Sequence, residues 1–302
     1  MTDQIIHGML CDQQIRFAAI SGKTLVSDAR ATHTLSRVAT AALGRQLLIT
    51  SMVSSWLKNE TDTVTTILSG GGAGGNLVCV GRFGGLVKGY AAEPAVELPL
   101  RADGKLDVAG YVGISGKLTL IRDLGLKEPY VGMCNLRSGE IAEDFAQYFT
   151  ASEQQPSIVY LGVRENAADG AVLGAGGLLI QTMPDCSDDA IEQVMQASPR
   201  FAALSERLAA GEPLAAILSD LFQTLSPTFS EEVTPLYRCD CTRERLERAL
   251  LSVGEHDLRE LLEQDGEAEL TCQFCQKNYH FDAEDLAILL REATDQGGSH
   301  AG

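Results

Sequence analysis

Basic residues are scarce in this chain of 302 residues. Lysine and arginine together number 24, against 41 aspartates and glutamates, which gives a formal net charge of −17 at pH 7. A chain with this charge repels the phosphate backbone of DNA and RNA. We therefore expect no nucleic-acid partner.

Long apolar runs are also missing, and we expect no secretory signal peptide. No stretch approaches the roughly 18 apolar residues that a membrane-spanning helix needs. Residues 1–5 have neither the basic nor the apolar region of a signal peptide. We expect a cytoplasmic protein with no membrane partner. In that compartment structural disulfides are rare, so its eight cysteines should be mostly reduced.

The motifs of several enzyme classes are absent. The glycine-rich segment 70–75 lacks the Lys-Ser/Thr pair of a phosphate-binding loop, and the Gly-Lys-Thr at 22–24 has Phe17 where the first glycine of that loop would stand. The glycines at 174–177 are not followed by the turn and helix of a dinucleotide site. The five histidines are scattered and form no convincing nucleophile–base arrangement with a serine or cysteine. The sequence therefore predicts tight turns or close strand packing at these glycines, and no enzyme.

Four of the eight cysteines cluster near the C-terminus. They form a CxC pair, Cys239 and Cys241, and a CxxC pair, Cys272 and Cys275. Four soft ligands in this arrangement predict a closed, tetrahedral Zn²⁺ site. The same thiols can also form disulfides, so the site has the chemistry of a redox switch.

Two histidines near this motif are alternative ligands. His280 lies five residues after Cys275, and His256 lies between the two cysteine pairs. Because four thiolates complete the zinc shell, we expect both histidines to be non-ligands.

The segment between the cysteine pairs argues against two other functions. It contains four arginines, no lysine and nine acidic residues, which does not suit a nucleic-acid zinc finger. A thioredoxin-like CxxC usually acts alone at the start of a helix, whereas this one is paired with a CxC. The segment also has two short apolar stripes, at 246–253 and 258–262. Since they form too small a core to fold unaided, zinc should supply on the order of 10 kcal/mol of folding free energy.

The rest of the chain predicts an α+β protein. Strands are expected within 1–30, and a long, largely buried helix should run from an N-cap at Thr34 to about Lys58. Further strands are expected at 64–68, 77–80, up to Tyr90, 118–121, 130–136, 158–163 and 172–181, with a helix at about 139–150. Residues 183–225 predict short amphipathic helices, which need a packing partner.

These patterns predict four regions. They are a large N-terminal mixed sheet and helix domain at 1–182, a helical linker at 183–235 marked by Pro227 and Pro235, a small zinc-binding domain at 236–293 and a disordered tail at 294–302. The other four cysteines, Cys11, Cys79, Cys134 and Cys186, are expected to be small core residues.

The CxC and CxxC pairs at the end of an acidic chain of this size resemble the 33 kDa chaperonin family, the redox-regulated heat-shock holdases. The N-terminal domain shares further segments with that family: ELPL at 97–100, GKLDV at 104–108, LTLIRDLG at 118–125, KEPY at 127–130, SGEIAED at 138–144 and SEQQPS at 152–157. The likeness covers nearly the whole chain. One departure is the glycine-rich turn at 70–75, where relatives often carry an Asp and a Pro.

The resemblance implies a redox-switched chaperone. Zinc bound by Cys239, Cys241, Cys272 and Cys275 would keep the reduced protein inactive. Peroxide or hypochlorite would form the disulfides Cys239–Cys241 and Cys272–Cys275, release the zinc, unfold the small domain and free the linker. The exposed apolar surface would then hold unfolding client proteins without ATP, and the oxidised protein would dimerise. The alternative is a static zinc-stabilised scaffold that binds one specific partner.

Overall fold

The computed structural model describes residues 2–298, with side chains up to residue 294. The chain forms two compact units, Met1–Arg238 and Cys239–Gly302. The predicted zinc-binding domain began three residues earlier, at 236. The boundary lies later because Leu236 and Tyr237 belong to a strand of the first unit.

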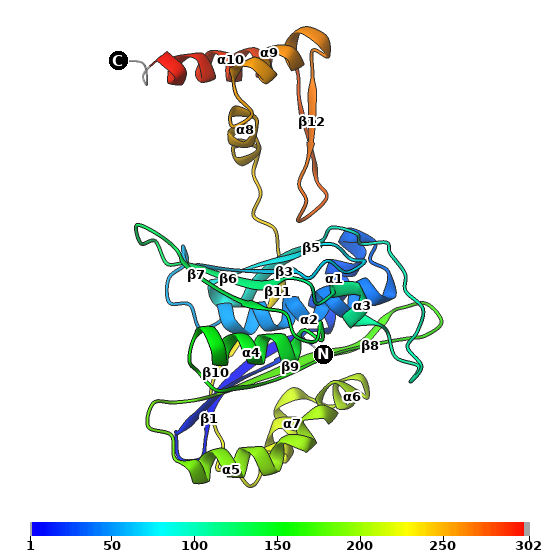
Figure 1. Ribbon diagram of the computed structural model, residues 1–302, viewed down its shortest axis with the longest axis vertical. Helices are drawn as coiled ribbons and strands as arrows, with labels where there is room; N and C mark the ends of the chain where they lie inside the picture. Colours follow the sequence, from blue (N-terminus) through cyan, green and yellow to red (C-terminus); the bar gives the residue numbers. More distant parts are fainter. Residues whose placement is uncertain (1, 299–302) are drawn as a thin grey trace. The chain divides into compact units, whose positions relative to one another are not determined.

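The first unit contains two β-sheets (Figure 1). The first sheet has the order β10-β1-β2-β9-β8, and all its neighbouring strands are antiparallel. Its strands are β1 (Gln4–Leu10), β2 (Ile15–Ser21), β8 (Ser157–Glu165), β9 (Val172–Thr182) and β10 (Thr228–Val233).

The second sheet has the order β11-β5-β4-β3-β6-β7. Only β11 pairs in parallel, with β5. The strands are β3 (Thr63–Ser69), β4 (Leu77–Arg82), β5 (Leu86–Ala91), β6 (Lys117–Asp123), β7 (Tyr130–Asn135) and β11 (Leu236–Tyr237). The strands predicted from residue 64 to residue 181 are therefore confirmed.

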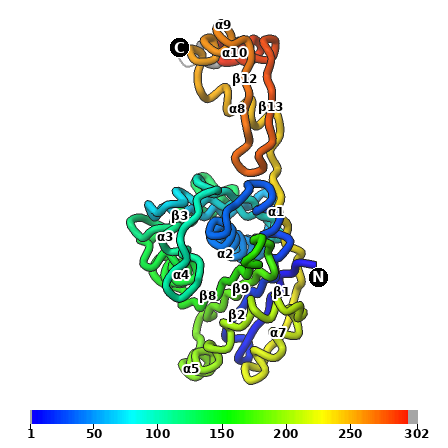
Figure 2. The backbone as a smooth tube through the Cα atoms, turned by 90° about the vertical axis from the view of Figure 1, so that its right-hand side faces the viewer, coloured from blue at the N-terminus to red at the C-terminus, as the bar shows by residue number. Residues whose placement is uncertain are grey.

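Helix α2 (Arg37–Ser54) lies between the two sheets, as Figure 2 shows at the centre of the unit. Of its 18 residues, only Arg37 and Arg45 are not buried. It packs on β3, β4 and β5 on one side and on β2, β8 and β9 on the other. A helix surrounded in this way must be apolar on almost every face, which is what the sequence predicted.

The start of this helix was predicted wrongly. A separate helix, α1 (Lys23–His33), precedes it, and Thr34 is the left-handed residue that ends α1, with φ of 50°. The N-cap of α2 is Ser36, whose Oγ accepts a hydrogen bond from the Ala39 amide at 3.1 Å. Serine and threonine are both good N-caps, so residue type alone does not show that the helix begins after Ser36 and not after Thr34. The left-handed backbone at Thr34 separates the two helices.

Shorter helices complete this unit: η1 (Phe83–Gly85), α3 (Val108–Val112) and α4 (Ala142–Ser152). The glycine-rich segment 70–75 packs its backbone against α3, with Gly72 N donating to Val112 O at 3.1 Å. A Cβ atom on Gly72 would lie 2.4 Å from Gly113 N. The tight turn expected at 70–75 is confirmed, with Gly75 N donating to Gly72 O at 3.2 Å, but it packs closely on a helix and not on a strand.

The segment 183–225 is helical, as predicted. It forms α5 (Asp188–Ala197), η2 (Ser198–Ala203), α6 (Leu204–Ala209) and α7 (Leu214–Leu221). These helices cover the face of the first sheet that α2 does not contact (Figure 1). At the centre of this layer, the Phe222 ring lies 4.9 Å from Phe17 of the sheet and 5.5 Å from Phe201.

Residues 226–235 were predicted to be a linker, but they contain strand β10. It pairs with β1 at the edge of the first sheet, with Ile5 opposite Val233 and Met9 opposite Thr228. Its residues are largely exposed, because an edge strand needs only one neighbour and no buried face. A polar segment between two prolines gave no sign of this pairing.

The second unit consists of α8 (Arg243–Leu251), α9 (Glu255–Gln264), the hairpin β12 (Ala268–Thr271) and β13 (Asn278–Phe281), and α10 (Ala283–Gly298). Its buried core is small: Leu250, Leu258, Cys272, Tyr279, Phe281, Leu286 and Leu289.

Helix α10 continues into the segment predicted to be a disordered tail, 294–302. Its last turns follow the helix pattern, and Thr294 Oγ1 donates to Leu290 O at 2.8 Å. Residues 299–302 lie outside the described part of the chain. Among the described residues no helix combines the length and the apolarity that crossing a membrane requires.

Phe222→Ala tests the packing of the helices on the first sheet. Phe222 is fully buried, so truncation should lower the free energy of unfolding by about 3 to 5 kcal/mol. Urea unfolding followed by circular dichroism measures this loss. Leu126→Ala is the control, since Leu126 is 71% exposed and should change stability by less than about 0.5 kcal/mol. Equal stability of the two variants would contradict the described packing.

Candidate metal centre

The four clustered cysteines come from two places in the second unit. Cys239 and Cys241 lie in the extended segment before α8, and Cys272 follows directly after β12. A tight turn then carries Cys275, with Gln276 N donating to Cys272 O at 2.8 Å and Cys272 N donating to Lys277 O at 3.0 Å. This turn holds Cys272 and Cys275 close enough to bind the same metal ion.

The four sulfurs meet in a single cluster. All of them lie within 4.8 Å of one another. The Cys239 and Cys272 sulfurs are 3.8 Å apart, and the Cys241 and Cys275 sulfurs are 3.3 Å apart. A tetrahedral zinc ion with Zn–S distances of ~2.3 Å separates its sulfurs by ~3.8 Å. The donor set and its spacing therefore fit Zn²⁺.

These two sulfur separations each join one pair to the other. Both are far longer than the ~2.05 Å of a disulfide bond, so the cluster has the arrangement of reduced thiols. The space between the CxC and CxxC pairs is where a metal ion would sit.

Tyr279 is a neighbour of the cluster that the sequence analysis missed. Its hydroxyl lies 3.2 Å from the Cys241 sulfur and 3.2 Å from Cys241 O. Burial alone would raise the pKa of the Cys241 thiol, but hydrogen bonds from Tyr279 and from the other three cysteines lower that pKa to about 7. The same hydrogen bond raises the pKa of Tyr279 to about 12.

Burial raises the pKa of the Cys275 thiol. Of Cys241 and Cys275, Cys241 is therefore the more easily ionised near neutral pH. Thiolates bind zinc and react with oxidants, whereas thiols do neither well.

The sequence does contain a signal for the burial of Tyr279. In the strand Asn278–Phe281, Tyr279 and Phe281 alternate with polar residues, so both side chains lie on the buried face of the hairpin.

Both histidines lie outside the sulfur cluster. His280 is on the exposed face of β13, with Nε2 3.7 Å from Glu267 Oε2. The His256 side chain is 89% exposed on α9, beside Asp257 and Glu260. The structure thus brings together all four predicted cysteines and neither histidine.

Arg243 links three elements beside the cluster. It donates to His280 O at 2.7 Å and to Asp285 Oδ2 at 2.5 Å, and its guanidinium stacks on the Phe281 ring at 4.3 Å. These contacts join α8, β13 and α10, so they help a small core hold its shape.

The other four cysteines are part of the packing of the first unit. Cys11 and Cys79 are buried, and Cys134 and Cys186 pack against its two apolar clusters. Burial raises the pKa of all four thiols, most strongly that of Cys79. They are the less reactive thiols of the chain.

Comparisons with known proteins agree on one family. The family model described as Hsp33 protein matches residues 3–282. A protein named 33 kDa chaperonin from Caldanaerobacter subterraneus subsp. tengcongensis is 40% identical over 282 residues, which cover 93% of this chain and 95% of the relative. A protein of the same name from Clostridium perfringens is 41% identical over 293 residues, 97% of this chain and 92% of the relative.

A solved structure supports the same assignment. The crystal structure of the 33 kDa chaperonin (heat shock protein 33 homolog) from Thermotoga maritima superposes with a TM-score of 0.88 at 35% sequence identity. The match covers 98% of this chain and 100% of that chain.

Cys272→Ser tests the four-sulfur site. Serine keeps the size of the side chain but is a poor zinc ligand, so we expect zinc affinity to fall by at least tenfold. Competition with a zinc-sensitive dye measures the affinity. His280→Ala serves as the control and should bind zinc as the unaltered chain does. Full affinity in Cys272→Ser, or a loss in His280→Ala, would contradict four-thiolate binding.

Proposed function

The chain belongs to the Hsp33 family, and from this premise we propose that it is a redox-regulated, ATP-independent molecular chaperone and not an enzyme. The reduced protein is inactive and holds one Zn²⁺ ion through Cys239, Cys241, Cys272 and Cys275. The observation that carries the proposal is the convergence of these four sulfurs within 4.8 Å. Its place of action is the cytoplasm.

Bound zinc holds the thiols as thiolates and adds its binding free energy to the folding of the second unit. That unit depends on this contribution, because seven residues form the buried core of its described part, which is a small core. A metal ion between the two cysteine pairs would tie the segment 239–241 to the β12–β13 hairpin, beside the contact of the Tyr279 hydroxyl with Cys241 O.

Oxidation removes this link. One molecule of peroxide takes two electrons from a pair of thiolates, which form a disulfide, and with two protons from the solvent it becomes two molecules of water. We place the disulfides within the pairs, Cys239–Cys241 and Cys272–Cys275. A cross-pair disulfide such as Cys239–Cys272 would keep the hairpin pinned to the segment before α8, whereas disulfides within the pairs release it. Either pairing removes the thiolates that hold zinc, but only the pairing within the pairs, which the family resemblance implies, also releases the hairpin from the segment before α8.

The first unit ends in a weakly held segment directly before Cys239. Strand β11 has only two residues, and Arg238 N donates to Val87 O at 2.9 Å. The Tyr237 hydroxyl donates to Gly89 O at 2.8 Å and lies 2.8 Å from His33 Nε2. Short edge elements of this kind open first when their neighbours become disordered. Loss of structure at residue 239 therefore spreads back through β11 and β10 to the helices at 183–225.

Release of these helices uncovers apolar surface. The exposed face of the first sheet then carries Ile15, Phe17, Leu178 and Ile180, all at most 3% exposed in the closed state. Such a surface binds the apolar segments of unfolding client proteins, and in the oxidised state it also pairs with a second copy of the chain. The net charge of −17 favours neither nucleic acid nor membrane as a partner.

Light scattering from a heat-unfolding client tests the proposal. The oxidised, zinc-free protein should suppress aggregation, and the reduced, zinc-loaded protein should not. A zinc-sensitive dye records metal release in the same sample. Zinc release without any gain in suppression would instead favour a static zinc scaffold with one specific partner.

Tyr237→Phe tests the route from Cys239 into the first unit. Loss of the hydroxyl removes its bonds to Gly89 and His33, which should weaken the closed state by about 1 to 2 kcal/mol. We expect the Arg238 amide to exchange with solvent roughly tenfold faster in the reduced protein, as measured by NMR. Tyr130→Phe is the matched control, because Tyr130 is 48% exposed on β7. Unchanged exchange at Arg238 would show that Tyr237 does not hold this segment.

A further inference from the structure

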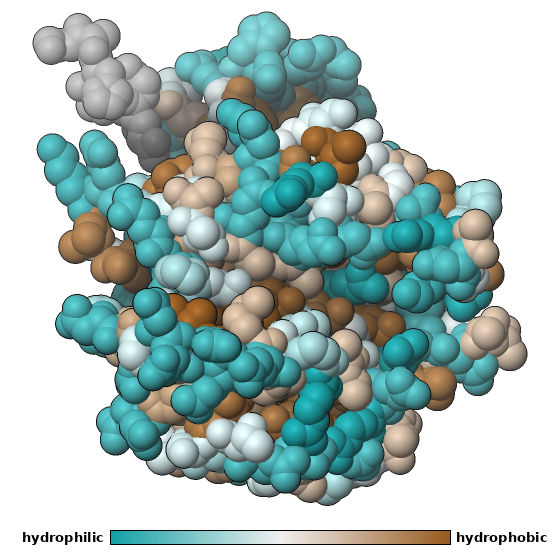
Figure 3. All heavy atoms as spheres, turned by 60° about the horizontal axis from the view of Figure 1, so that its bottom comes forward, coloured by the Kyte–Doolittle hydropathy of each residue, from teal (hydrophilic) through white to brown (hydrophobic). Residues whose placement is uncertain are grey.

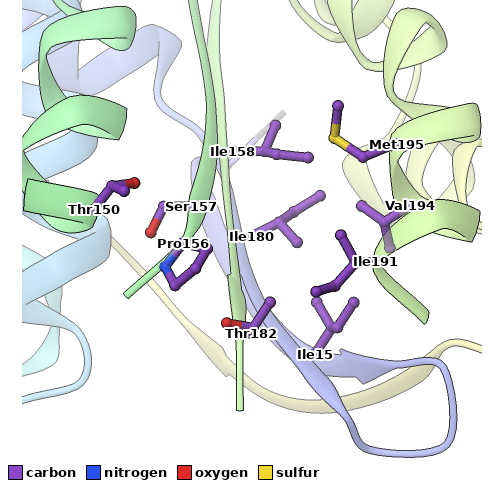
Figure 4. Close-up of a pocket in the computed structure, with 10 residues that line it drawn as sticks. All are labelled: Ile15, Thr150, Pro156, Ser157, Ile158, Ile180, Thr182, Ile191, Val194 and Met195. Atoms are coloured by element: carbon purple, nitrogen blue, oxygen red, sulfur yellow. The ribbon is translucent and has the colours of Figure 1, made fainter. Parts of the chain in front are cut away.

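An apolar cavity of about 190 Å³ lies between α5 and the first sheet. Figure 4 shows Ile158 and Ile180 reaching from β8 and β9 toward Ile191, Val194 and Met195 of α5. Ile180 and Val194 are almost fully buried, whereas Ile191 is 37% and Met195 55% exposed at the outer side. The cavity therefore has a closed floor and an accessible mouth. Figure 3, in which the lower part of Figure 1 comes forward, shows apolar residues in the recesses of this face beneath polar ones.

The lining has little to offer a polar ligand. None of the ten lining residues carries a charge. The Ser157 hydroxyl donates to Gln155 O at 2.9 Å and accepts from Gln181 Nε2 at 3.0 Å, and Thr150 Oγ1 donates to Ala146 O at 3.0 Å. A water molecule in a buried site needs two to four polar partners, which these engaged hydroxyls supply poorly. An uncharged, apolar occupant suits the cavity best.

The volume sets the size of that occupant. An engineered apolar cavity of about 150 Å³ binds benzene, so about 190 Å³ admits one ring or two small fused rings. The Met195 thioether at the mouth makes favourable contacts with aromatic ring edges. We propose that this cavity binds a small uncharged aromatic molecule, which holds α5 on the first sheet.

The site exists only while α5 is docked, because α5 supplies one wall and the strands supply the other. A ligand of the docked state shifts the equilibrium toward that state by the factor 1 + [L]/Kd. At ten times Kd, release of α5 becomes about tenfold rarer. The consequence for chaperone activity rests on the proposed function: the ligand would delay activation without touching the cysteines.

Indole is the probe, added to the reduced, zinc-loaded full chain. Titration calorimetry should give saturable binding with one site. Methyl NMR should place the shifts on Ile158, Ile180, Val194 and Met195. Amides of α5 should exchange about tenfold more slowly at ten times Kd.

Two variants fill the mouth of the cavity with side chains that start from exposed positions, so the fold should tolerate them. Ile191→Phe and Met195→Trp should each weaken indole binding at least tenfold. Ile114→Phe is the matched control, since Ile114 is 58% exposed and does not line the cavity. Its affinity for indole should equal that of the unaltered chain.

Three results would overturn the assignment: no saturation within the solubility of indole, methyl shifts centred elsewhere, or unchanged binding in both filled variants. Competition by an unfolded polypeptide for the reduced protein would reassign the cavity to client side chains. The binding measurements need neither oxidation nor a client. If they succeed while oxidation brings no chaperone activity, the proposed function fails and the cavity assignment stands. If they fail while activation occurs, the cavity assignment alone is wrong.

Discussion

The arrangement of the second unit depends on four sulfurs that come from two distant parts of the sequence. Cys239 and Cys241 precede α8, while Cys272 and Cys275 flank the turn of a hairpin some 30 residues later. Its described part has a small buried core of seven residues, with the contacts of Arg243 and Tyr279 beside it. Structural zinc supplies on the order of 10 kcal/mol in small zinc-binding peptides, as much as the whole stability of many domains. In the proposed function, a change in the bonding of sulfur is therefore also a change in the folding of this unit.

The helical segment of the first unit has a different basis for its stability. Its apolar stripe packs on the first sheet around Phe17, Phe201 and Phe222, whereas its ion pairs are on the outside. Arg207, for example, bridges Glu212 and Asp220 at the surface, where such pairs add little. The packing between these helices and the first sheet also leaves a cavity beside α5. In the proposed function, the helices at 183–225 cover the sheet in the reduced protein and leave it in the oxidised protein. Packing of limited strength suits such a change.

Much of this organisation could be predicted from the sequence, and the failures have physical reasons. Period-two and helical patterns located the strands from β3 to β9 and the buried helix α2, because burial imposes those patterns. The break at Thr34 was missed because a left-handed residue leaves no mark on the apolar spacing. Strand β10 was missed because an edge strand with exposed residues needs no apolar face. The cysteine spacing predicted the cluster, but Tyr279 became a neighbour of Cys241 only through the register of the β12–β13 hairpin.

Hydrogen exchange across residues 183–238 tests most directly whether the sulfur cluster governs the first unit. The reduced, zinc-loaded chain and the peroxide-oxidised chain would be compared peptide by peptide. We expect oxidation to remove protection from α5, α6, α7 and β11, while β3 and β4 remain protected. Equal protection of α5–α7 in both states would contradict it, because the chemistry at the cysteines would then end within the second unit.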